Sequence, residues 1–143
     1  MGGELNLAKL QDRMAPELHP DTFVYCSLAD FTLPPGITPT CTFAEAEGLT
    51  VIVERSQAQR FGLLFEFEAR LITLTIHSSL EAVGFLAKLA AKLAQANISC
   101  NVVSAYHHDH LFVPREEATA AMALLASLAS EQRCDPRASS AGP

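Results

Sequence analysis

Residues 70–114 read RLITLTIHSSLEAVGFLAKLAAKLAQANISCNVVSAYHHDHLFVP, and the spacing of their apolar residues changes along the stretch. In the first eight residues apolar and polar side chains alternate, which is typical of a strand with one buried face. From Leu80 to Ala94 apolar residues recur three and four positions apart, as on one face of a helix. Alternation returns at Ile98 and again at His110. The stretch therefore predicts strand, helix, strand, strand.

The predicted helix has sequence signals at both ends. Ser78 and Glu81 have the spacing of a capping box, in which the hydroxyl and the carboxylate each accept a backbone N–H at the helix start. Asn97 suits the helix end, because asparagine tolerates the left-handed conformation. A structural reason for Gly84, inside the predicted first turns, is close packing of the helix on the sheet.

A second helix is predicted from Glu116 to Ser130, where the apolar residues again share one face: Ala118, Ala121, Met122, Leu125, Leu128 and Ala129. Residues 131–143 are small and polar, so they predict a disordered tail. The second half thus has strand, helix, strand, strand, helix. This order is one strand short of a ferredoxin-like unit.

The first half has weaker patterns. They predict a short opening helix that Pro16 and Pro20 terminate, a strand from Thr22 to Leu28, a proline-rich loop, two strands about Gly48, the short helix RSQAQRFG, and a strand LLFEF leading into the second half. A unit of this size buries only part of its surface by itself. Two units, residues 1–66 and 67–130, are therefore expected to pack side by side.

The composition is that of a globular protein and limits the kinds of partner. Hydrophobic residues make up 49% and charged residues 18% of the 143 residues, and the net charge is -6. The ten Lys and Arg residues form no basic run, which argues against a nucleic-acid partner. Neither a signal peptide nor an apolar run of the ~18 residues that a membrane span needs can be identified. We expect a cytoplasmic protein without a membrane partner.

Catalytic and cofactor motifs are missing from the sequence. The four cysteines contain no Cys-x-x-Cys pair, and Cys26 and Cys100 fall in strand patterns where buried, reduced cysteines are expected. No nucleotide-binding loop, zinc-protease motif or nucleophile elbow is present. Ser78 and His77 are a nucleophile and a base only by adjacency. We predict no enzyme, with no catalytic residue, no cofactor and no metal.

The polar stretch His107, His108, Asp109, His110 allows three interpretations. It has enough donors for a metal ion, but neighbours on a strand point to opposite faces, so only His108 and His110 could readily share one. Asp109 could instead accept backbone amides in a hairpin turn. A polar turn is the preferred interpretation, followed by a ligand or interface site and then by a metal site.

From Arg70 to Pro114 the sequence resembles an ACT domain, in particular the small bacterial proteins with two ACT-like units that are similar to the paired ACT domains of aspartate kinases. HSSLEAVG and ISCNVVSAYHHDHLFV carry the resemblance, while FVYCSL and TFAEAEGLTVIVE of the first half fit it more loosely. It implies an α+β fold of two tandem ferredoxin-like (βαββαβ) units with antiparallel sheets and helices packed on one face. It also implies a regulatory, amino-acid-binding module that is not an enzyme.

In this family the ligand lies between two units, held by the loop after the first strand, the start of the helix and the following strand. Carried over to this sequence, the resemblance implies a ligand site of His77, Ser78, Ser79, Leu80, Glu81, Ala82, Val83, Gly84 and Asn101. The free N–H groups of a helix start suit the carboxylate of an amino acid, and Glu81 or Asn101 could receive its ammonium group. Many amino-acid-sensing members have Pro-Gly where this chain has Glu81-Ala82, which places a carboxylate at the site.

Three functions therefore compete. The preferred one is a regulatory module that binds a small molecule, an amino acid in our expectation, between ACT units of a homo-oligomer such as a dimer. The second is an interaction module without a ligand, because a unit that lacks its last strand has an exposed sheet edge. The third is a metal-binding or hydrolytic protein that uses His107–His110.

Overall fold

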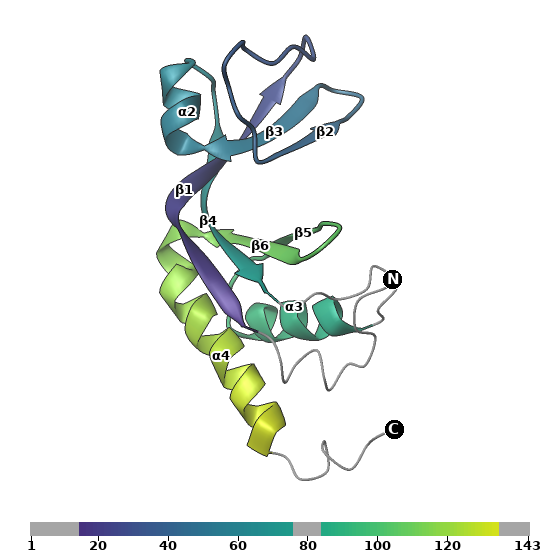
Figure 1. Cartoon of the computed structure of the whole chain (residues 1–143), viewed down its shortest axis with the longest axis vertical. Coiled ribbons are helices and arrows are strands. Elements are labelled where there is room, and N and C mark those ends of the chain that lie inside the picture. The colour runs from purple at the N-terminus through teal and green to yellow at the C-terminus, as the bar shows by residue number, and fades with distance from the viewer. Residues whose placement is uncertain (1–14, 76–83, 135–143) are drawn as a thin grey trace. The chain divides into compact units, whose positions relative to one another are not determined.

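The computed structural model describes residues 15–75 and 84–134 (Figure 1). The described strands are hydrogen-bonded in the order β2-β3-β1-β4-β6-β5. Along the chain the elements are β1 (Pro16–Leu28), β2 (Cys41–Ala44), β3 (Leu49–Glu54), α2 (Arg55–Arg60), β4 (Glu66–Leu74), α3 (Phe85–Gln95), β5 (Asn101–Ser104), β6 (Asp109–Pro114), a 3-10 turn (Arg115–Glu117) and α4 (Ala118–Cys134). The predicted opening helix lies outside the described residues.

The chain divides into two compact units that differ from a simple halving of the sequence. The N-terminal unit comprises residues 20–70, and the C-terminal unit comprises residues 1–19 and 71–143. The strands β1 and β4 each run from one unit into the other along the backbone. The division into residues 1–66 and 67–130 expected from the sequence cuts β4 after its first residue.

One continuous strand, β4, stands where the sequence predicts two. The strand β4 begins at Glu66, so Leu63–Phe65, the first three residues of the predicted strand LLFEF, are not part of it. The Leu63 N–H donates to the Ala58 carbonyl at 2.9 Å, which continues the turn at the end of α2. Because Leu63 is held in this turn, β4 begins only after it, at Glu66.

The last strand that the C-terminal unit was expected to lack is supplied by the start of β1. The Thr75 N–H and hydroxyl both donate to the Ala15 carbonyl, at 3.1 and 2.8 Å. Within this unit the order is thus β1-β4-β6-β5, that of a ferredoxin-like sheet. The prediction that a missing strand exposes a sheet edge is wrong, because that strand precedes the rest of its unit in the sequence.

Two prolines that were expected to separate a helix from a strand are part of β1. Pro16 begins the strand and Pro20 lies within it. The strand β3 pairs only with the section Phe23–Leu28 of β1. Both prolines therefore lie in the part of β1 that does not pair with β3. A proline has no N–H to donate, and this is tolerated where that side of the strand has no neighbouring strand.

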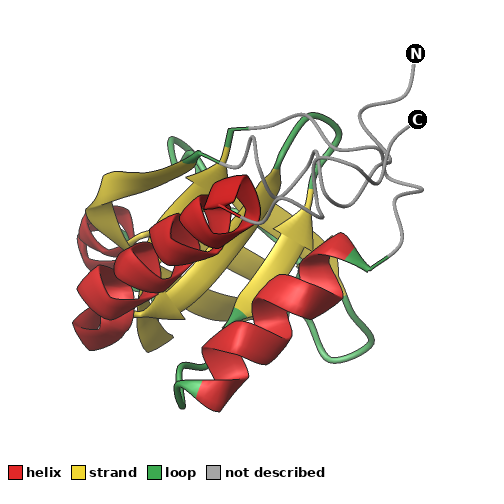
Figure 2. Cartoon of the chain, turned by 90° about the horizontal axis from the view of Figure 1, so that it is seen from below, coloured by secondary structure: helices red, strands yellow, loops and turns green. Residues whose placement is uncertain are grey.

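The helices α3 and α4 cover one face of the strands of the C-terminal unit (Figure 2). Apolar side chains from β4 and β6 meet the helices there, and they form a buried core with members from every layer: Ile72, Leu74, Phe85, Leu89, Leu93, Ile98, Leu111, Val113, Ala118, Ala121, Leu125, Leu128 and Ala129. Burial of this apolar surface is the main force that holds the layers together.

The buried face of α3 differs from the predicted one. Phe85, Leu89 and Leu93 are buried, at a spacing of four residues, whereas Ala87 and Ala94, which belong to the apolar series predicted from Leu80 to Ala94, are exposed. Alanine is compatible with either environment, so a helix rich in alanine marks its buried face weakly. The larger residues gain more from burial and decide the orientation.

The predicted end of α3 is confirmed. Asn97 has a φ of 61°, in the left-handed region. The Asn97 N–H donates to the Ala94 carbonyl and the Ile98 N–H to the Leu93 carbonyl, both at 2.9 Å. These are the two hydrogen bonds of a Schellman motif, and buried Ile98 adds the apolar contact that accompanies it.

The helix α4 has the predicted buried face but continues past Ser130 to Cys134. The added residues include Glu131, Gln132 and Arg133, whose helix propensities are high. Residues 135–143 of the predicted tail lie outside the described residues. None of the described helices is long and apolar enough to cross a membrane.

In the N-terminal unit the two strands about Gly48 and the short helix α2 are confirmed. The core of the unit consists of Val24, Cys26, Val51, Val53 and Ala58. Residues 29–40 form a loop where a complete βαββαβ unit has its first helix. Leu33 and Ile37 of this loop pack against the core, and the Gln57 amide binds the loop at the Thr38 N–H and carbonyl.

Candidate functional site

The ligand site implied by the resemblance lies in the loop that joins β4 to α3. His77–Val83, which are seven of the nine predicted site residues, lie outside the described residues. Both ends of the loop are described. At one end Thr75 is held to Ala15 by two hydrogen bonds, and at the other end Gly84 is the N-cap of α3.

Gly84 is required by its backbone conformation and not by close packing. Its φ is 90° and its ψ is -16°, and a Cβ added there would meet nothing within 4 Å. The predicted reason for this glycine is therefore wrong. Residues with a Cβ rarely adopt such a φ, so glycine lets the chain enter α3 at this angle.

No side chain of the described residues caps the first turn of α3. Its N-cap, Gly84, has no side chain to accept the first N–H groups, and the turn contains no acidic residue. Ser78 and Glu81, the predicted capping box, lie outside the described residues. Unsatisfied N–H groups and the helix dipole make such a terminus favourable for a carboxylate.

The second described member of the predicted site, Asn101, is exposed at the start of β5, opposite Phe112. The hairpin between β5 and β6 is at the other end of these strands. Thr73 of β4 is hydrogen-bonded to His110 of β6. Because these neighbouring strands are antiparallel, the C-terminal end of β4, which Thr75 follows, points toward this hairpin. The register thus brings the hairpin, rather than Asn101, to the end of the sheet where the loop begins.

The hairpin contains the histidines of the polar stretch. Its turn is formed by residues 105–108 and closed by the Ala105 N–H, which donates to the His108 carbonyl at 3.0 Å. Tyr106 is 73% exposed, and its ring centroid is 4.8 Å from that of His107. Asp109 is the first residue of β6 and is buried, so it belongs to the strand and not to the turn.

His110 belongs to a hydrogen-bonded row across three strands. The Thr73 Oγ1 atom lies 2.9 Å from His110 Nδ1 and 3.0 Å from His19 Nε2. Ile72 and Leu74 point into the helix-covered core, so Thr73 between them is on the opposite face of the sheet. The single hydroxyl proton can be donated to only one ring, and the other ring must donate its own N–H.

The environment of His110 favours its neutral form. Burial lowers the pKa of His110, and the nearby His108 and His19 lower this pKa further, while Asp109 acts in the opposite direction. Sequence reasoning identified His110 but missed His19 and Thr73. All three are at polar positions of alternating strands, yet the pairing that brings them together depends on long-range register.

Metal and nucleophilic chemistry find little support among the described residues. These residues contain no group of three or more His, Cys, Asp or Glu arranged to hold a metal ion. Burial raises the pKa of Cys100 to about 11, so this cysteine is a thiol at neutral pH and a poor nucleophile.

Comparison with known proteins identifies both halves of the chain. Family models described as ACT domain match residues 2–70 and residues 66–127. The sequence matches no curated protein significantly.

Solved structures include one related in sequence and others similar in fold. A Vibrio cholerae protein of unknown function, described as a possible transport protein, is 42% identical; the match covers 86% of this chain and 94% of that chain with a TM-score of 0.74. The regulatory subunit of aspartate kinase from Thermus thermophilus has a TM-score of 0.62 at 11% identity and is matched over 95% of its length by 79% of this chain. The chain therefore belongs to the ACT-domain family and carries two ACT domains in tandem.

Proposed function

We propose that this protein is a non-catalytic regulatory module and that it binds an amino acid at residues 77–84. ACT domains are regulatory domains that bind small molecules, and this chain consists largely of two of them. The observation that carries the proposal is the first turn of α3, which follows the loop directly and whose N-cap, Gly84, has no side chain to cap it. That the ligand lies between two ACT units stays a prediction.

The chemistry of this turn supports a ligand with a carboxylate. The first four N–H groups of a helix lack intrahelical acceptors, and the positive end of the helix dipole adds to their attraction for an anion. Glu81, in the same loop, is an acidic group that could receive the ammonium of an amino acid. The carboxylate and the ammonium of an amino acid would thus each have a complementary group.

A thermal-shift panel of the common amino acids tests this function. A ligand at ~100 times its dissociation constant adds ~2.7 kcal/mol of stability, which raises the melting temperature by several degrees for a domain of this size. We expect one amino acid to give such a shift, and Ser78→Ala to reduce it. The matched control is Ser99→Ala, which alters an exposed serine outside the loop.

We also propose that the protein acts as a homodimer, since ACT domains often form oligomers. Light scattering after size exclusion measures this directly, and a mass near 15.4 kDa would instead indicate a monomer.

A second candidate function is an interaction module without a ligand. One observation favours it: the edge strand β5, Asn101–Ser104, is uncharged and largely exposed, and Val102 is 37% exposed. Such an edge can pair with another strand. A dimer that Val102→Lys dissociates, together with a flat amino-acid panel, would favour this candidate.

A further inference from the structure

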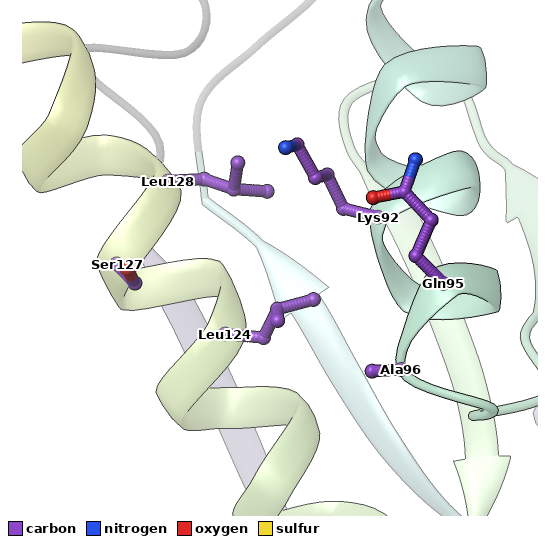
Figure 3. A pocket seen from close by; sticks show the side chains of 6 residues that line it. All are labelled: Lys92, Gln95, Ala96, Leu124, Ser127 and Leu128. Atoms are coloured by element: carbon purple, nitrogen blue, oxygen red, sulfur yellow. The ribbon is translucent and has the colours of Figure 1, made fainter.

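A hollow of about 270 Å³ lies between α3 and α4 of the C-terminal unit (Figure 3). Lys92 and Gln95 reach into it from α3, and Leu124 and Leu128 point into it from α4, with Ala96 and Ser127 at its sides. Its volume equals that of roughly nine water molecules in the liquid. This is close to the lower end of the sizes found for small-molecule sites, which begin at about 300 Å³.

The hollow has three polar side chains, of which one is charged. Lys92 contributes an ammonium group, and Gln95 and Ser127 contribute an amide and a hydroxyl. None of the lining residues that the structure describes is acidic. Among the described residues no ion pair is formed by Lys92, and α4 carries no charged residue between Ala118 and Ala129. Among the described side chains that line the hollow, the net charge is therefore one positive charge, from Lys92.

The C-terminal end of α3 carries a partial negative charge, which opposes the positive charge of Lys92. Lys92 is in the last turn of the helix, where the dipole corresponds to about half a negative charge. The carbonyls of Lys92, Leu93 and Ala94 already accept N–H groups in the turn that ends the helix. A full ammonium charge outweighs this partial charge, so the hollow remains favourable for an anion.

We propose that this hollow is a second ligand site, which takes a small carboxylate with a short apolar tail. The carboxylate binds the Lys92 ammonium and the Gln95 amide, and the tail lies on Leu124 and Leu128. A free amino acid fits this site less well than a simple carboxylate, because the described lining residues include no acidic side chain for an ammonium group. The site is therefore distinct in position and in chemistry from the proposed amino-acid site at residues 77–84.

The probe for this site is 4-methylpentanoate, titrated into the full-length ¹⁵N-labelled protein and followed by NMR. We expect saturable shifts of the backbone N–H signals of Gln95, Ala96, Ser127 and Leu128, with a dissociation constant on the order of millimolar for so small a ligand. The neutral amide of the same acid should bind at least about threefold more weakly, since it lacks the charge that pairs with Lys92.

Three variants test the contacts. Lys92→Gln should weaken binding at least about threefold. Its matched control is Lys88→Gln, which removes a lysine one turn earlier on α3 that does not line the hollow. Ala96→Leu should abolish binding by filling the space, and Ala96 is exposed, so the fold should tolerate the change. Ser78→Ala should leave carboxylate binding unchanged, which separates this site from the amino-acid site.

Several results would overturn the proposal. They are shifts that do not saturate, equal binding of the acid and its amide, or equal weakening by Lys88→Gln and Lys92→Gln. Shifts at the same residues that depend on protein concentration without the probe would show that a second copy of the chain covers the hollow instead.

Discussion

At the scale of single residues, local chemistry was predictable and long-range partners were not. The role of Asn97 follows from its own tolerance of the left-handed region, and its φ of 61° bears this out. His110 was identified as a polar strand residue, but its contact with Thr73 depends on how β4 and β6 align. A sequence without an alignment contains no direct information on that register.

Gly84→Ala should destabilise the protein by about 1 kcal/mol although there is room for the added methyl group. The cost arises because a residue with a Cβ is strained at a φ of 90°. Urea denaturation measures the change, and Gly84→Asn should cost less because asparagine tolerates positive φ better. If Gly84→Ala stabilises the protein, the described entry into α3 is wrong.

The stability of the protein should fall as the pH is lowered below about 6.5, the ordinary pKa of histidine. The pKa of His110 is lowered in the folded state, so the unfolded chain binds protons first and acid favours unfolding. The contribution is fully present above pH 6.5 and is lost as the pH falls through the folded-state pKa. The groups that face His110 are His19, His108 and Asp109, together with the Thr73 hydroxyl.

Urea midpoints measured between pH 5 and pH 8 test this dependence. His110→Asn should reduce the fall in stability on the acid side, whereas His107→Asn, a change at an exposed position of the same hairpin, should leave most of it. An equal pH dependence in the wild type and in His110→Asn would contradict the account of this histidine.

At the scale of elements, the helices and strands that contain large apolar residues, or that end at a residue typical of helix or strand ends, were predicted best. The buried face of α4 is lined by large leucines among its alanines and was predicted correctly, while the face of α3 was misassigned because alanines were given the same weight as leucines. The start of β1 was missed because Pro16 and Pro20 suggest a break. Both prolines are tolerated there only because of where the neighbouring strand β3 ends.

Removal of residues 1–19 should unfold the C-terminal unit. The deletion takes away the first part of β1, with the Ala15 carbonyl that binds Thr75 and the Leu18 side chain that packs on the core. Since α3 and α4 belong to this unit, the far-ultraviolet circular dichroism of helices should largely disappear. Removal of residues 1–13, which leaves Ala15 and all of β1 in place, is the control. A helical signal that survives the longer deletion would show that β1 is dispensable to this unit.

At the scale of the whole molecule, the tandem arrangement was predictable from the second half and its connectivity was not. The order strand, helix, strand, strand, helix was readable between Arg70 and Ser130. The last strand of this unit, the start of β1, could not be identified, because the whole N-terminal unit separates it from the rest of the C-terminal unit in the sequence. Family membership then gives the function its class, while the amino-acid ligand stays a proposal.

The central claim is that this ACT-domain protein binds an amino acid through the loop before α3. Isothermal titration calorimetry of the wild-type chain and of Ser78→Ala and Ser99→Ala, with each amino acid that shifts the melting temperature, tests it most directly. The account predicts saturable binding of one amino acid that Ser78→Ala weakens and Ser99→Ala leaves intact. Absence of binding for every amino acid, or equal binding by all three proteins, would contradict it.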